Sequence, residues 1–166
     1  QMALSKALDG FRPSRKKGSA PNSTGMSEYT IASGYAANIF TGDVVTINAG
    51  NIEVVTTVGL GNDVPLGVFG GCNYTKDGEY VYGKYWPSGT SASDIVAHIY
   101  DDANYTFVCQ ADASVTAGDV YSRTFNVTLG TGSTCTGRSG HGLEAGTRGD
   151  DGMMTVLGAF KEPGNA

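Results

Sequence analysis

From Ser27 onward, the chain consists of short apolar or alternating runs separated by turn residues every eight to twelve positions. Gly accounts for 25 of the 166 residues, whereas the good helix formers Leu, Glu, Lys and Gln are sparse. Short strands at this spacing are typical of sandwiches and barrels. We therefore expect an all-β fold, an antiparallel β-sandwich or barrel of about eight to ten short strands.

The strands expected from this pattern lie at residues 28–33, 38–40, 43–48, 52–57, 65–71, 79–86, 94–100, 105–110, 119–123 and 153–160. Residues 48–51 and Asp77-Gly78 have the composition of hairpin turns, because Asn, Asp and Gly tolerate positive φ. A Gly-rich segment at about 129–152 has almost no large apolar residue, and we expect a long surface loop there. The pattern leaves open which strands pair and whether they form one barrel or two.

The first 26 residues differ from the rest, since they mix Pro, Gly, Ser and basic residues without periodicity. We expect an extended basic N-terminal arm at 1–26 and a β-rich body at 27–166. Residues 1–17 carry five basic residues and one acidic residue, a net charge of +4, whereas the remainder carries six basic and fifteen acidic residues, a net charge of −9. An acidic body disfavours direct nucleic-acid binding, but the arm suits an acidic partner.

The sequence lacks the common local motifs of catalysis and metal binding, among them G-x-S-x-G, H-E-x-x-H, the P-loop and the EF-hand loop. Paired carboxylates for glycoside hydrolysis need no such motif, so a hydrolase site remains an open alternative. Cys72, Cys109 and Cys135 form no CxxC pair and have no zinc-finger spacing. No apolar run reaches the length of a membrane helix. We expect no enzyme, no cofactor, no metal and no membrane partner.

Residues 81–108 contain several side chains that could be catalytic. One interpretation makes His98 a general base that is oriented by Asp101 or Asp102. Alternation along DIVAHIY instead places His98 in the middle of a strand, and Asp101 to Asn104 in the turn that follows. The pattern favours this structural interpretation. His141 lies in the Gly-rich segment, where we expect it to be exposed to solvent.

Tyr85 and Trp86 precede Pro87 at the end of an expected strand. A proline there ends the strand, so the two aromatic residues are expected to cap one end of the core. The other interpretation is an aromatic platform that recognises a sugar on a surface.

Five segments of the chain resemble, in the same order and at similar intervals, virion structural proteins of tailed bacteriophages, especially marine ones. These are GFRPSRKKGSAPNSTG followed by YTIASGYAANIFTGDVV, then LGVFGGCNYT, then KYWPSGTSASDIVAHIYDDANYTFVCQAD, and finally VLGAFKEPGN. The resemblance covers about residues 10–125 and 153–166. The Gly-rich insert at 130–152 departs from the pattern.

The resemblance implies a head decoration, or cement, protein of the outer capsid surface. Such a protein bridges neighbouring major capsid protein subunits, often as a homotrimer, and is made in the bacterial host cytoplasm. The basic residues of the arm are the candidate capsid contacts: Arg12, Arg15, Lys16 and Lys17. The alternative is a phage tail, fibre or surface adhesion module that binds host glycan through Tyr85, Trp86 and the 129–152 loop.

Overall fold

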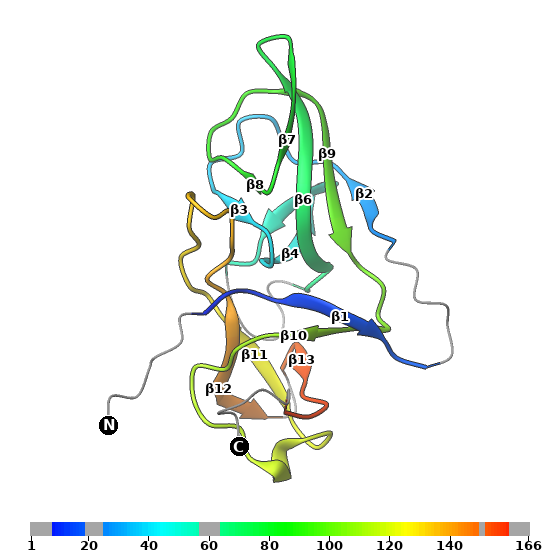
Figure 1. Ribbon diagram of the computed structural model, residues 1–166, viewed down its shortest axis with the longest axis vertical. Helices are drawn as coiled ribbons and strands as arrows, with labels where there is room; N and C mark the ends of the chain where they lie inside the picture. The colour runs from blue at the N-terminus through cyan, green and yellow to red at the C-terminus, as the bar shows by residue number, and fades with distance from the viewer. Residues whose placement is uncertain (1–7, 19–24, 57–63, 150–151, 160–166) are drawn as a thin grey trace.

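The computed structural model describes residues 8–18, 25–56, 64–149 and 152–159. Within this part the fold is nearly all-β, with several antiparallel sheets, as the sequence predicts (Figure 1). The strands are β1 (Arg12–Lys16), β2 (Ser27–Tyr29), β3 (Ile39–Phe40), β4 (Val44–Asn48), β5 (Asn51–Val54), β6 (Gly67–Lys76), β7 (Glu79–Gly83), β8 (Tyr85–Trp86), β9 (Ser93–Tyr100), β10 (Tyr105–Val108), β11 (Thr124–Thr128), β12 (Gly142–Gly149) and β13 (Met154–Thr155), and a 3-10 turn, η1, spans Ala117–Asp119.

The largest sheet is organised around the long strand β6. Its order is β2-β9-β6-β4-β5, and β7 also pairs with β6 beyond the point where β4 ends. Both predicted hairpins are present. Ala49 and Gly50 connect β4 to β5, and Asp77 and Gly78 connect β6 to β7, all four with positive φ.

Three smaller sheets complete the described fold: β1-β10, β3-β8 and β12-β11-β13. Figure 1 shows the large sheet in the upper half of the molecule and β11, β12 and β13 in the lower half, with β1 and β10 crossing between them. Strand β1, which belongs to the predicted arm, therefore lies against the body.

Two clusters of apolar side chains form the core. The first lies on one face of the large sheet and is centred on Trp86, Phe69 and Ile99, none of which is exposed. The second joins Phe11 of the arm to Val68 of the large sheet and Val127 of β11. Because burial of a large apolar side chain contributes about 1.5–3 kcal/mol, Phe11 makes the arm part of the folded structure.

Three strand predictions need correction. Residues 119–123 form η1 and a turn instead of a strand, because the Asp119 carboxylate accepts hydrogen bonds from the Thr116 amide at 3.0 Å and the Thr116 hydroxyl at 2.6 Å. Strand β11 was not predicted, although its Phe125 and Val127 are buried at alternate positions. Strand β12 lies inside the segment that we expected to be a surface loop.

Several glycines of the Gly-rich segment lie too close to backbone or ring atoms to carry a side chain. A Cβ atom on Gly130 would lie 2.0 Å from the Gly140 carbonyl oxygen, and one on Gly132 would lie 2.3 Å from the Phe40 ring. Glycine is required at such close approaches.

In the described part of the chain, no helix is long and apolar enough to cross a membrane.

Candidate functional site

The described part of the arm is held by main-chain hydrogen bonds along its length. Strand β1 pairs antiparallel with β10, from Arg12 opposite Val108 to Lys16 opposite Tyr105, with a register shift between Pro13 and Arg15. The amide of Lys17 then donates to the carbonyl of Asn104 at 2.8 Å. The predicted extension is present in β1, but the strand is attached to the body.

A tight contact fixes the start of the arm. The amide of Gly10 donates to the His141 carbonyl at 3.1 Å, and the amide of Phe11 donates to the Gly42 carbonyl at 3.0 Å. A Cβ atom on Gly10 would lie 2.6 Å from the Ser139 Cβ and 3.1 Å from the Gly42 Cα. We call Gly42, Ser139 and His141 the seat of the arm.

The four candidate capsid contacts have different surroundings. Arg12, Arg15 and Lys17 are exposed. The Lys16 side chain is only 12% exposed, and its Nζ lies 2.8 Å from Asp102 Oδ2 and 5.0 Å from the centre of the Tyr105 ring. The hydrogen bond to Asp102 raises the pKa of Lys16, so Lys16 contributes to holding the arm on the body.

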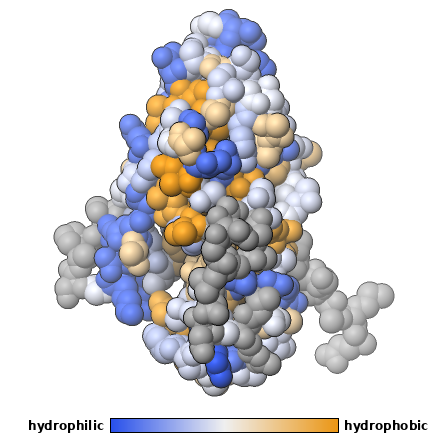
Figure 2. Space-filling view, turned by 180° about the vertical axis from the view of Figure 1, so that it is seen from behind, coloured by the Kyte–Doolittle hydropathy of each residue, from blue (hydrophilic) through white to orange (hydrophobic). Residues whose placement is uncertain are grey.

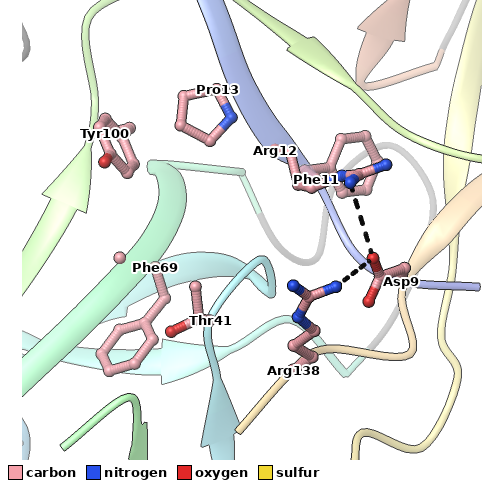
Figure 3. A pocket seen from close by; sticks show the side chains of 9 residues that line it. Asp9, Phe11, Arg12, Pro13, Thr41, Phe69, Tyr100 and Arg138 are labelled. Atoms are coloured by element: carbon pink, nitrogen blue, oxygen red, sulfur yellow. Dashed lines mark hydrogen bonds and ion pairs between the residues drawn. The ribbon is translucent and has the colours of Figure 1, made fainter. Parts of the chain in front are cut away.

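Asp9 lies between two arginines next to the seat. Its Oδ2 is 2.8 Å from Arg138 Nη1 and 3.9 Å from Arg12 Nη1 (Figure 3). A cavity of about 170 Å³ opens beside this group, between the arm and the side chains of Phe69 and Tyr100. Both arginine side chains are 59% exposed, so these ion pairs position the arm more than they stabilise the fold.

A buried polar cluster lies directly beneath the arm, and it corrects the expectation that His141 is exposed. His141, Asp43 and Ser139 are only 4%, 2% and 3% exposed. His141 Nδ1 accepts the Val44 amide at 3.2 Å, and its Nε2 lies 3.5 Å from Asp43 Oδ1. The other Asp43 oxygen accepts the Phe40 amide at 2.7 Å.

The cluster contains the residue types of a hydrolase triad, but its contacts are structural. Ser139 Oγ accepts the amide of His141 at 2.8 Å and hydrogen-bonds to Asp43, so the hydroxyl does not contact the imidazole as a nucleophile would. Burial lowers the pKa of His141 and raises that of Asp43. The buried cluster connects the arm to the body, because the His141 carbonyl accepts the Gly10 amide.

His98, Asp101 and Asp102 are held as the structural interpretation predicts. His98 lies within β9, and its Nε2 is 2.8 Å from Asn73 Oδ1. Asp101 accepts the hydroxyl groups of Ser27 and Tyr29, both at 2.8 Å. Asp102 accepts the Asn104 amide in the turn between β9 and β10, besides its ion pair with the arm.

Tyr85 and Trp86 pack into the body. Trp86 is fully buried and meets Tyr74 edge to face at 5.1 Å, while Tyr85 is half-buried and stacks on Phe40 at 5.4 Å. Trp86 therefore lies inside the first core and does not cap one end of it, and Tyr85 packs beside it on Phe40. Trp86 cannot be a surface-recognition residue, because no part of it reaches solvent.

The three cysteines are free thiols: Cys72 is buried, Cys109 is half-buried and Cys135 is exposed. Burial raises the pKa of Cys72 to about 12 and that of Cys109 to about 11, so neither is a ready thiolate nucleophile. In the described ranges, no three His, Cys, Asp or Glu residues gather closely enough to hold a metal ion.

Sequence reasoning missed Asp9, Asp43 and Arg138. Asp9 and Arg138 are 129 positions apart, so no local pattern could have paired them. Comparison of the chain with family models, with curated proteins and with solved structures finds no match.

Proposed function

We propose that this chain is a virion structural protein that decorates and cements the outer surface of a bacteriophage capsid. In this proposal it bridges neighbouring major capsid protein subunits through its arm, acts by adhesion and assembles as a homotrimer. The observation that carries the proposal is a basic strand attached to an acidic body, with Arg12 and Arg15 exposed on the strand and Lys17 exposed directly after it. The ordered segments that resemble phage decoration proteins supply the partner.

A pre-ordered arm suits this task. Strand β1 is already paired and anchored, so binding does not have to order the residues that make the contact. Each exposed cation contributes little alone, but contacts that repeat around a shell add avidity. A protein that binds the expanded lattice better than the immature one stabilises the expanded lattice by linkage.

Point variants test the arm better than truncation. Removing residues 1–20 would also remove Phe11 from the core, so the loss of binding could reflect unfolding. The variant Arg15→Gln/Lys17→Gln removes two exposed charges and keeps every main-chain contact of β1. The matched control, Lys76→Gln/Lys84→Gln, removes the same charge from exposed residues of the body.

Cosedimentation with expanded capsids of the phage that encodes the chain, over a series of salt concentrations, is the measurement. The arm variant should bind more weakly than the control, and the difference should shrink as salt increases, because screening removes the contribution of the arm charges. Equal decoration by wild type, arm variant and control at every salt concentration would falsify the role of the arm.

The alternative, a tail, fibre or surface adhesion module, loses its proposed contact at Trp86, which is fully buried, and keeps Tyr85, which is half-buried. The copy number in purified virions separates the two functions. Decoration requires a copy number comparable with that of the major capsid protein, whereas a tail component needs only a few copies. Light scattering of the purified protein tests the homotrimer.

A further inference from the structure

The large sheet has an open face on the side opposite the first core. Near the arm this side is covered, because Tyr100 packs with the second core and Met26 lies over Gly70. Farther along, the face carries Tyr80 and Tyr82 of β7, which are 69% and 66% exposed. The residue between them, Val81, packs into the first core, so both tyrosines lie on the open side.

The Tyr82 side chain reaches across β6 toward β9. A Cβ atom on Gly71 of β6 would lie 3.7 Å from the Tyr82 hydroxyl, and the Tyr82 and His98 ring centres are 6.4 Å apart with their planes inclined by 37°. Gly71 has φ +140° and no side chain, so the Tyr82 hydroxyl lies over bare backbone there. The ring therefore lies along the sheet, with its face available for contact.

Polar groups lie next to these rings in a fixed arrangement. Asn73 is opposite Tyr82 in the ladder, and Thr75 is opposite Tyr80. The 2.8 Å contact between Asn73 Oδ1 and His98 Nε2 holds both side chains in place. The face thus combines two exposed tyrosines, whose Cα atoms are about 7 Å apart along one strand, with amide, hydroxyl and imidazole groups.

The apolar area of the face is too small for a stable protein interface. Two rings exposed by about two-thirds offer on the order of 300 Å². A standard interface buries about 800 Å² on each partner and has an apolar core. A ligand of a few sugar rings matches the smaller area.

The charge of the face excludes anionic ligands. Among the charged residues of the strands that form it, alternation places Glu28 of β2 and Asp94 of β9 on this side, with His98, whereas Lys76 and Glu79 point to the side of Tyr74 and Val81. The net charge is −2, which repels nucleic acid and acidic polysaccharide.

We propose that the Tyr80–Tyr82 face binds a neutral carbohydrate chain, with the tyrosine rings stacking on the apolar faces of successive sugar rings. Asn73 and His98 hydrogen-bond to sugar hydroxyl groups beside Tyr82. This site is distinct from the arm and does not depend on capsid binding, so either proposal can fail without the other.

The test titrates ¹⁵N-labelled protein with cellohexaose, maltohexaose and mannohexaose, and with hexagalacturonate as an anionic probe. A neutral oligosaccharide should shift the amide signals of β7 and of Asn73. Tyr80→Ala and Tyr82→Ala should each weaken binding by about three- to tenfold, because one aromatic contact contributes on that order. Tyr82→Phe keeps the ring and should retain most of the affinity.

Tyr121→Ala is the matched control, because Tyr121 is 67% exposed and lies outside the face. Melting curves of all variants show whether each is folded. The proposal is overturned if no neutral probe binds, if only hexagalacturonate binds, or if Tyr82→Ala and Tyr121→Ala bind equally well. Shifts confined to other strands overturn it as well.

Discussion

At the scale of single residues, Gly10 decides whether the arm can sit on the body. Its φ is +76°, and any side chain would meet Ser139. Gly18 has φ +88° but nothing within 4 Å, so it is a control for backbone strain alone. Gly18→Ala should cost about 1–2 kcal/mol, and Gly10→Ala about 1–3 kcal/mol more, from overpacking. Urea unfolding measures both, and equal costs would show that the contact with the seat is not tight.

His141 makes the stability of the protein depend on pH. Burial lowers its pKa below the ordinary value of 6.5, and Nδ1 already accepts the Val44 amide, so the folded state resists protonation. The unfolded chain binds that proton, so the stability is present above pH 6.5 and is lost as the pH falls below it. Asp43, whose pKa burial raises, acts in the opposite direction and limits the loss.

The free energy of unfolding, measured from pH 8 to pH 5, checks this prediction. Wild type and His98→Gln, which both keep His141, should lose stability toward pH 5, and His141→Gln should lose less over the same range. Parallel profiles for all three proteins would contradict it. The burial of His141 could not be predicted from the sequence, because its ring partners Asp43 and Val44 are about one hundred positions away and its neighbours in the chain are glycines.

At the scale of elements, alternation predicted the strands whose buried side chains are large. Strands β4, β6 and β9 were found this way, and in β9 the alternating residues Ala97 and Ile99 are buried. In β7, alternation also places Tyr80 and Tyr82 together on the open face, because Val81 between them points into the first core. Strand β12 escaped prediction because, of its described side chains, only Leu143 and the small Ala145 are in the buried core, and they alternate with glycine and charged residues. The strand predicted at 119–123 does not form, because the hydrogen bonds between Asp119 and Thr116 stabilise a 3-10 turn there in spite of the apolar residues that follow.

At the scale of the whole molecule, the sheet order could not be predicted. Strand β6 pairs with β4 and β7 along one edge and with β9 along the other, and short antiparallel strands of similar composition do not specify such an order. The attachment of the arm was equally hidden. Its basic, Pro-containing sequence resembles a free segment, yet one aromatic residue, Phe11, commits it to the second core.

Phe11 therefore tests whether the two cores unfold as one unit. Trp86 is the only tryptophan of the chain and lies in the first core, so its fluorescence reports that core alone. Phe11→Ala removes a buried ring from the second core and should cost about 3–5 kcal/mol. Neighbouring residues of β4 and β6 belong to different cores, since Val44 and Val68 lie in the second core and Val45 and Phe69 in the first. If these neighbours couple the cores, the unfolding transition reported by Trp86 fluorescence loses the full amount, about 3–5 kcal/mol, the same as the whole protein. If the midpoint of the Trp86 fluorescence transition stays at the wild-type value while the midpoint of the far-UV transition falls, the two cores unfold as independent units.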